Sequence, residues 1–233
     1  MRPPIYKPNG AAAEYGDWAL NIYDGCPHAC PYCYVPLAMH KDRATFHAHC
    51  APCPGIVEET RKQLEKTGMT GQTVHLCFSC DPFPTGYDCT PTLDIIRLLK
   101  EHGNNVQILT KGDGSPCLDL LDGGDWYGVT IDGSETGEQW AKRTWGFTEA
   151  KVRGIKTWVS FEPVLYPDNV LSSIRIMGAD CDKVKIGKLN YNTPPVPINW
   201  ADFGRAAEAL CQSMGLDYYI KDSLRKEMER HGN

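Results

Sequence analysis

The sequence has no hydrophobic run long enough to cross a membrane, and its first ten residues, MRPPIYKPNG, contain no signal-peptide core. It also has no low-complexity segment and no stretch with the composition of a linker. We therefore expect a cytoplasmic protein with no membrane partner, folded as one domain over residues 1–233.

The chain also has no excess of positive charge. The chain has 24 lysines and arginines against 29 aspartates and glutamates, which gives a net charge of −5. Proteins that bind nucleic acid without sequence preference are usually basic. We therefore do not expect tight non-specific DNA binding, although the composition is compatible with a local basic groove.

Cysteine, in contrast, is abundant. The chain has eleven cysteines, and an odd number without a secretion signal argues against a disulfide framework. In a reducing compartment, metal binding or catalysis is the better explanation for so many thiols.

The body of the chain repeats one pattern, in which a helix-like stretch ends in glycine and a strand-like apolar run follows. Such runs are TVHLCFS after Gly68, NVQILT after Gly103, KTWVSFE after Gly154, DKVKIG after Gly178 and DYYI after Gly215. Two further strands are predicted in ALNIY and WYGVT, and Thr90 is the predicted N-cap of the helix TPTLDIIRLLKE. Alternating strands and helices predict an α/β fold with a parallel sheet, and roughly seven strands suit an open or partial barrel.

Polar residues follow most of these strands, where the active sites of such folds lie. They are Ser79, Cys80, Asp81, Lys111, Thr130, Asp132, Glu162, Lys188, Asn190 and Lys221. Loops are polar in any protein, so a single member of this set carries little weight. As an ensemble, they predict a functional site at the carboxyl ends of the strands.

The most informative stretch is YDGCPHACPYCYVP, residues 23–36, directly after the first predicted strand. Cys26, Cys30 and Cys33 have the spacing Cys-x3-Cys-x2-Cys. Three thiolates that hold a cubane iron–sulfur cluster leave one iron open for chemistry. The alternatives are a structural zinc site, because zinc ribbons share Cys-x2-Cys, and cysteines that bind nothing.

With Tyr32 before Cys33, this motif resembles the radical S-adenosylmethionine (SAM) signature Cys-x3-Cys-x-aromatic-Cys. The segments FSCDPFPTGYD, QILTKG and TWVSFEPV narrow the resemblance to the spore photoproduct lyase-like branch, also described as DNA repair photolyase-like, over nearly the whole chain. The resemblance implies a partial (β/α)6 TIM-type barrel with a 4Fe-4S cluster in the loop at about residues 24–36. It also implies reductive cleavage of SAM to a 5′-deoxyadenosyl radical that abstracts hydrogen, with a flavodoxin or ferredoxin as the reductant.

The resemblance also implies roles for individual residues. Ser79 and Asp81 would bind the SAM amino group, since a carboxylate pairs well with an ammonium group. Lys111 would pair with the SAM carboxylate, with Thr130 as a second candidate and solvated lysine as the alternative for Lys111. Tyr32 completes the set of cofactor-binding residues.

Three residues are predicted to be catalytic: Tyr34, Cys80 and Glu162. Spore photoproduct lyase has a hydrogen-donor cysteine on its second strand, but Phe78 occupies that position here, which puts thymine-dimer repair in doubt. Cys80 lies two residues on, on the same strand face by parity, as a shifted donor or a pocket-lining residue. Tyr34 would meet substrate or SAM. Glu162 would bind a ribose hydroxyl or accept a proton, unless it only caps the turn at Pro163.

A second cysteine and histidine group lies in FHAHCAPCPG. His47, His49, Cys50 and Cys53 have the spacing of metal ligands, and they predict an accessory zinc or second iron–sulfur site in an insertion at about residues 46–54. The alternative is an incidental loop before a helix.

The leading hypothesis is thus a radical SAM enzyme that acts on a nucleic-acid base, for repair or modification. A small molecule or a peptide is the alternative substrate. The hypothesis from another class is a non-catalytic zinc-binding interaction protein, which metal analysis distinguishes, since iron with sulfide supports the cluster and zinc alone the module.

Overall fold

The computed structural model describes residues 3–230, which divide into two compact units. The first unit comprises the described residues up to Tyr127 together with Arg153–Ile155. The second comprises Gly128–Val152 and the described residues from Lys156 onward. The prediction of a single domain stays a prediction.

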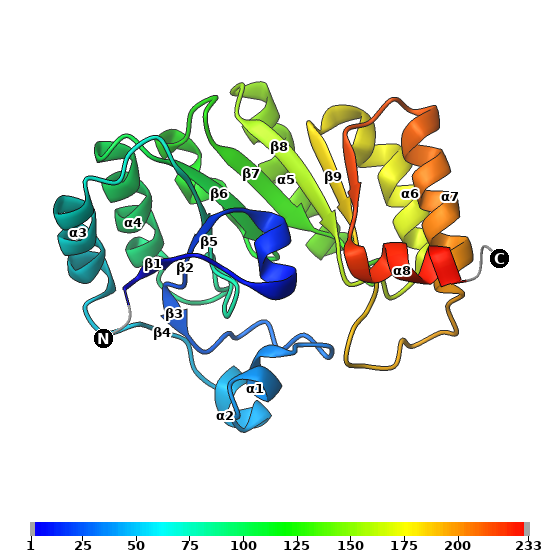
Figure 1. Cartoon of the computed structure of the whole chain (residues 1–233), viewed down its shortest axis with the longest axis horizontal. Helices are drawn as coiled ribbons and strands as arrows, with labels where there is room; N and C mark the ends of the chain where they lie inside the picture. Colours follow the sequence, from blue (N-terminus) through cyan, green and yellow to red (C-terminus); the bar gives the residue numbers. More distant parts are fainter. Residues whose placement is uncertain (1–2, 231–233) are drawn as a thin grey trace. The chain divides into compact units, whose positions relative to one another are not determined.

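Eight strands follow the order β1-β2-β5-β6-β7-β8-β9-β10 in one mostly parallel sheet (Figure 1). Their bounds are β1 Ile5–Tyr6, β2 Trp18–Leu20, β5 Thr73–Leu76, β6 Asn105–Thr110, β7 Trp126–Thr130, β8 Lys156–Phe161, β9 Lys183–Ile186 and β10 Tyr218–Ile220. Every apolar run that the sequence predicts as a strand contributes to this sheet. The edge strand β1 was not predicted, because it is short and flanked by prolines; it pairs antiparallel with β2.

In the first unit, β2 pairs in parallel with β5, and β5 with β6. Two amphipathic helices, α3 (Ile56–Thr67) and α4 (Thr90–Glu101), pack side by side on this part of the sheet (Figure 1). Helix α3 ends at Gly68, whose φ of 62° is the left-handed cap that the sequence predicts. Shorter elements complete the unit: η1 Gly10–Tyr15, β3 Tyr23–Asp24, α1 Val35–Ala38, α2 Arg43–His47, β4 Ala51–Pro52 and η2 Ser115–Leu120.

In the second unit, β8 pairs in parallel with β9, and β9 with β10. Its helices are α5 Gly137–Val152, α6 Pro167–Met177, η3 Gly178–Asp180, α7 Trp200–Ser213 and α8 Asp222–Arg230. Helix α7 packs against both α6 and α8. Registers Ser160↔Lys185 and Tyr219↔Lys185 place Trp158, Lys185 and Tyr219 on one sheet face, where the Lys185 ammonium lies 5.5 Å and 5.8 Å from the two ring centroids.

Two cap predictions are wrong. Thr90 is the first residue of α4 rather than its N-cap; its amide and hydroxyl both donate to Asp88 Oδ1, and Cys89 is the cap. Gly178 has φ −60° and ψ −38°, so the chain continues there into η3 and does not turn left-handed. Local composition places both ends within a residue or two, but the neighbouring hydrogen bonds decide the cap.

Candidate active site

The three-cysteine loop leaves the small antiparallel sheet of β3 and β4 at Gly25. This glycine has φ +83°, and a Cβ placed there would lie 2.2 Å from the His49 carbonyl oxygen, so only glycine fits. The next residue, Cys26, donates its amide to the Phe46 carbonyl at 3.3 Å. The loop is therefore held tightly against α2 from its first cysteine.

Arg43, on α2, holds the other end of the loop. Its guanidinium donates to the carbonyl oxygen of Cys33 at 3.0 Å and to that of Cys30, while the Cys33 amide also donates to the Cys30 carbonyl at 3.0 Å. A planar fork of donors suits two adjacent carbonyls in a way that an ammonium group cannot match. Arg43 thus fixes the turn that presents the second and third cysteines.

The three thiols are half-buried. Burial raises the pKa of the Cys26 thiol to about 12, against hydrogen bonds from the His28 and Asp81 backbone, and the nearby Asp81 carboxylate and Cys30 thiol add to the rise. Burial also raises the pKa of Cys33, where Cys30 again contributes and Arg43 opposes. Cys30 is therefore within electrostatic reach of both other thiols.

This donor set fits an iron–sulfur cluster. Three thiols on one short loop, with backbone N–H groups directed at Cys26 and Cys33, are suitable ligands because such hydrogen bonds favour the thiolate. Among residues 3–230, no three His, Cys, Asp or Glu side chains stand around one point as ligands of a single ion. A cubane differs from a single ion in that its irons lie between the cysteines that hold it.

Asp81 connects the loop to the ends of two strands. One carboxylate oxygen accepts from the Thr110 hydroxyl at 2.5 Å and the Phe83 amide at 2.9 Å; the other accepts from the Lys111 amide at 2.8 Å. His28, from the cysteine loop, lies 3.9 Å from the second oxygen. The side chain is buried, so these donors supply the hydrogen bonds that its oxygens would otherwise lack.

Lys111 and Tyr32 lie together. The Lys111 ammonium stands 5.3 Å from the centroid of the Tyr32 ring, a cation–π contact between the end of β6 and the cysteine loop. Lys111 is half-buried, so the alternative of a freely solvated lysine loses support. An ammonium held beside the cluster loop is suitably placed to bind a carboxylate.

Ser79 and Tyr34 are anchored by the turn after β5. The amides of Phe78 and Ser79 donate to Asn21 Oδ1 at 2.7 Å and 3.0 Å, and the Tyr34 hydroxyl donates to the Phe78 carbonyl at 3.2 Å. Because β5 ends at Leu76, Phe78 and Cys80 lie in a turn. The parity argument that placed Cys80 on the strand face of Phe78 is therefore wrong.

The first unit thus contains nine of the eleven predicted site residues: Cys26, Cys30, Tyr32, Cys33, Tyr34, Ser79, Cys80, Asp81 and Lys111. The other two predicted site residues, Thr130 and Glu162, belong to the second unit. Thr130 is buried, and its carbonyl accepts from Arg143 at 2.8 Å. Glu162 pairs with the buried Lys221 at 2.8 Å.

The histidines of the predicted accessory site have other contacts. His47 Nδ1 lies 2.8 Å from the Cys26 carbonyl and His49 Nδ1 lies 2.9 Å from the Thr45 carbonyl. Within the described residues, His47 Nε2 is a buried nitrogen with no hydrogen-bond partner. Burial raises the pKa of Cys50 and of Cys53, and Cys80 is close enough to add to the rise in both.

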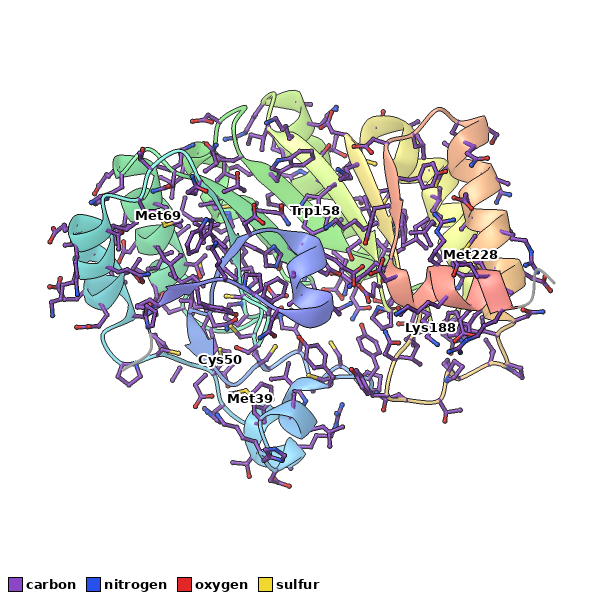
Figure 2. The ribbon with its side chains drawn as sticks, in the orientation of Figure 1. Met39, Cys50, Met69, Trp158, Lys188 and Met228 are labelled. Atoms are coloured by element: carbon purple, nitrogen blue, oxygen red, sulfur yellow. The ribbon has the colours of Figure 1, made fainter. Side chains whose placement is uncertain are left out.

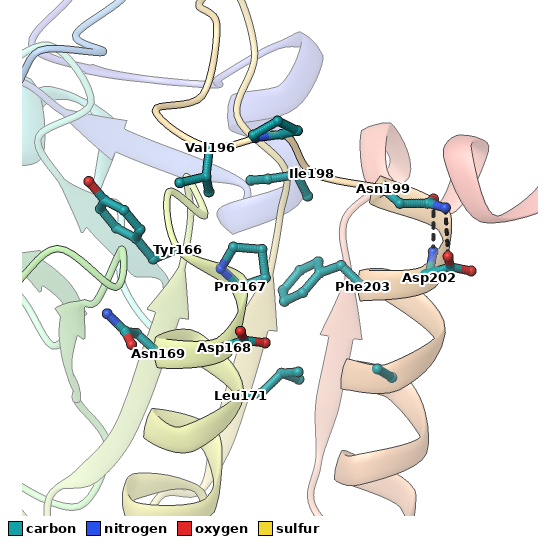
Figure 3. A pocket seen from close by; sticks show the side chains of 12 residues that line it. Tyr166, Pro167, Asp168, Asn169, Leu171, Val196, Ile198, Asn199, Asp202 and Phe203 are labelled. Atoms are coloured by element: carbon teal, nitrogen blue, oxygen red, sulfur yellow. Dashed lines mark hydrogen bonds between the residues drawn. The ribbon is translucent and has the colours of Figure 1, made fainter.

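The second unit contains a cavity of about 570 Å³ at the starts of α6 and α7 (Figure 3). Pro167, Leu171 and Phe203 supply apolar walls, and Asp168 and Asp202 supply carboxylates. Figure 3 shows the cap of α7 at its rim, where Asn199 accepts from the Asp202 amide at 3.2 Å and donates to its carboxylate at 2.6 Å. Since α6 and α7 follow β8 and β9, this cavity lies on the carboxyl side of these strands.

Sequence reasoning missed Asn21, His28 and Arg43, whose contacts join segments far apart in the chain. It also missed Cys77, although Cys77-x2-Cys80 repeats the spacing of Cys50-x2-Cys53 and was visible in the sequence.

No family model matches the chain. The uncharacterized protein ORF301 of Acidianus two-tailed virus is 47% identical over 55 residues, which are 20% of this chain and 18% of that protein. The uncharacterized protein Rv2578c of Mycobacterium tuberculosis is 30% identical over 112 residues, 45% of this chain and 32% of that protein. The matches thus span less than a third of either relative.

Solved structures show the fold. A spore photoproduct lyase mutant with bound AdoMet and dinucleoside spore photoproduct superposes with a TM-score of 0.67, over 91% of this chain and 78% of that chain, at 9% identity. Streptococcus suis SuiB bound to precursor peptide SuiA gives a TM-score of 0.64 over 91% of this chain and 51% of that chain, at 13% identity.

Both neighbours are radical SAM enzymes, and the chain shares the fold of these two proteins. More narrowly, it has the fold of spore photoproduct lyase. The predicted partial TIM-type barrel and the predicted resemblance are confirmed at this level. No helix among the described residues is long and apolar enough to span a membrane.

Proposed function

We propose that this chain is a radical SAM enzyme of the spore photoproduct lyase type. The observation that carries the proposal is the loop of Cys26, Cys30 and Cys33, with Tyr32 in the aromatic position, on this fold. A 4Fe-4S cluster and SAM, when bound, would supply a 5′-deoxyadenosyl radical that abstracts hydrogen from the substrate.

The chain's own residues would hold and orient these groups. Cys26, Cys30 and Cys33 would be the cluster ligands, with Arg43 keeping the loop in shape. Lys111 would bind the SAM carboxylate, and Thr130 is the second candidate for it. Ser79 and Asp81 would receive the SAM amino group, although the contacts of Asp81 with Thr110 and Lys111 already give it a positioning role.

The roles proposed for the remaining residues depend on their anchors. Tyr34, fixed to the Phe78 carbonyl, would border the substrate. Glu162, paired with Lys221, would accept a hydrogen bond from a ribose hydroxyl or a proton. Cys80 is the candidate hydrogen donor only as long as it keeps its S–H proton.

A nucleic-acid base is the favoured substrate, because the fold is shared with a lyase that binds a dinucleoside photoproduct. The net charge of −5 favours a short or single nucleotide target over non-specific binding to duplex DNA. SuiB, which binds a precursor peptide, supports a peptide as the second candidate. A flavodoxin or ferredoxin is the proposed reductant.

The test is an anaerobic assay for 5′-deoxyadenosine after reconstitution with iron and sulfide and addition of reductant and SAM. The wild type is expected to form it, whereas Cys30→Ala is expected to lose it because two thiolates hold a cluster poorly. Cys181→Ser, in the second unit, is the matched control and should behave as wild type. Full activity in Cys30→Ala would refute the ligand assignment.

Substrate class is tested in the same assay with two additions. Short oligonucleotides that contain damaged or modified bases, deuterated at the base, are expected to raise the rate and to transfer deuterium into 5′-deoxyadenosine, while unrelated deuterated peptides do neither. Stimulation by peptides alone would move the assignment to a peptide substrate.

A further inference from the structure

Two Cys-x2-Cys pairs, Cys50-x2-Cys53 and Cys77-x2-Cys80, are anchored on one short segment of chain, residues 20–23. Leu20 pairs with Leu76 in the large sheet, and its carbonyl accepts the Cys77 amide at 2.8 Å. Tyr23 pairs with Pro52 in the small sheet, and the Ile22 carbonyl accepts the Cys53 amide at 2.8 Å. The two pairs are therefore neighbours by backbone geometry, although 23 residues separate Cys53 from Cys77.

The turn that carries the second pair is held in shape by the same segment. The residues between Cys77 and Cys80 donate both their amides to the Asn21 side chain. Cys77 has φ +69°, in the left-handed region that side chains other than glycine rarely adopt. Such strain in a well-anchored turn is typical of functional sites.

The side chains of the two pairs meet at Cys80. Cys80 adds to the rise in pKa that burial causes at the neighbouring Cys77 thiol. Its charge also acts on Cys50 and Cys53, whose pKa values are raised mainly by burial, to about 12 for Cys50. Figure 2 shows several sulfur atoms in the region around Cys50.

We propose that Cys50, Cys53, Cys77 and Cys80 bind one Zn²⁺ ion, at a site separate from the Cys26, Cys30 and Cys33 loop. Two Cys-x2-Cys pairs brought together from distant parts of a chain supply the tetrahedral thiolate set that structural zinc prefers. Binding replaces the four thiol protons, which go to solvent, and involves no change of oxidation state.

Among residues 3–230, no three ligand-type side chains already surround one ion position. Binding would therefore require the four thiols to lose their protons and close on the ion. Lys41, which opposes the burial-driven rise in the pKa of Cys53, supplies positive charge beside the proposed thiolates.

This ligand set replaces the predicted one, because Cys77 and Cys80 take the places of His47 and His49. The ring nitrogens Nδ1 of both histidines already contact backbone carbonyls. The site also has a consequence for the proposed mechanism: a zinc-bound Cys80 thiolate has no S–H, so it cannot donate hydrogen. The ion would instead hold the turn that leads into Asp81.

The test is metal analysis of the full chain by mass spectrometry, without added iron, together with Co²⁺ substitution followed by absorption spectroscopy. The wild type is expected to contain about one zinc per chain, and the cobalt form to show intense thiolate-to-metal bands. Cys50→Ser and Cys80→Ser are each expected to lose most of the zinc and these bands.

Three controls separate this site from its alternatives. Cys30→Ala removes a proposed cluster ligand and is expected to keep its zinc, so the two sites fail independently. His47→Gln is expected to keep it too, and so is Cys181→Ser. If a serine variant does not fold, Co²⁺ titration of the wild type against a chelator still reports the site.

Zinc retained in both Cys50→Ser and Cys80→Ser would overturn the proposal, and so would zinc lost from His47→Gln alone. The proposal would also be overturned by a wild-type chain that binds neither Zn²⁺ nor Co²⁺. In that case all four thiols would still react freely with a thiol reagent after the chain is denatured and refolded with zinc. Absence of 5′-deoxyadenosine would leave the zinc site standing and count only against the radical SAM function.

Discussion

The buried carboxylate of Asp81 accepts a hydrogen bond from the backbone amide of Lys111 at 2.8 Å. This bond joins the turn after β5 to the end of β6. It therefore couples two residues that the proposed function assigns to the two groups on the α-carbon of the SAM methionine, the amino group and the carboxylate. The position of the Lys111 backbone depends on a residue 30 positions away.

Replacement of Asp81 should therefore destabilise the fold. Asp81→Ala leaves the Thr110 hydroxyl and the Phe83 and Lys111 amides without their acceptor, so we expect a loss of about 2–4 kcal/mol in the free energy of unfolding. Denaturant unfolding measures it. The control Asp119→Asn removes one exposed ion pair with Arg153 and should cost about 0–1 kcal/mol. Equal effects of the two variants would contradict the role given to Asp81.

Lys111 is expected to determine SAM affinity. Lys111→Met removes the proposed partner of the SAM carboxylate and should weaken binding by about tenfold or more, equivalent to about 1.4 kcal/mol. Lys111→Arg should recover part of the loss because it keeps the charge. Isothermal titration of SAM into the reconstituted protein measures both, with the exposed Lys226→Met as control. An unchanged dissociation constant in Lys111→Met would exclude the assignment.

Arg43 should matter for cluster retention. Arg43→Lys keeps the charge but cannot bridge the carbonyls of Cys30 and Cys33, so the loop loses its fixed turn. We expect less iron per chain after desalting and faster iron loss to a chelator. Arg97→Lys, which alters an exposed pair with Asp94 on α4, is the matched control. Iron loss at the wild-type rate would show that Arg43 does not hold the loop.

The second unit offers a test of pH-dependent stability at Asp182. Burial disfavours its charge, but hydrogen bonds from Lys151 and from the Thr157 amide, each at 2.7 Å, prevail and lower the pKa of Asp182 below 3.8. A carboxyl group whose pKa is lower in the folded than in the unfolded state stabilises the fold above the unfolded value. That stabilisation is lost as the pH falls through the folded value.

Asp182→Asn should therefore cost about 1–2 kcal/mol near pH 7, the range for a charged hydrogen bond reduced for partial exposure. The difference from the wild type should shrink below about pH 4. Urea unfolding at several pH values measures it, with the exposed Asp17→Asn as control. A difference that grows on acidification would contradict the assigned direction.

Apolar runs were sufficient to predict seven of the eight strands in the large sheet, because the apolar residues of these strands contribute to the core. The edge strand β1 was not predicted, because its position depends on a hydrogen bond from the Ile5 amide to the Gln63 side chain, 58 residues away. The short pairing of β3 with β4 was not predicted either. Pro52 is a poor strand former, and its partner Tyr23 is distant in the sequence.

In the candidate site, too, the features set by contiguous residues were predictable and those set by long-range contacts were not. The cluster loop was predictable because its three ligands and Tyr32 are contiguous. Arg43 and Asn21 were not, because what they bind becomes clear only when the chain folds. Cys80 was assigned by strand parity, which fails because β5 ends four residues earlier and the chain turns at Cys77.

The most direct test of the central claim, a three-thiol cluster with one iron open to SAM, is electron paramagnetic resonance of the reduced, reconstituted protein. We predict a 4Fe-4S signal that changes on addition of SAM, because the SAM amino and carboxylate groups would occupy the open iron, and no such signal in Cys30→Ala. A signal that SAM leaves unchanged, or one retained in full by Cys30→Ala, would contradict the account.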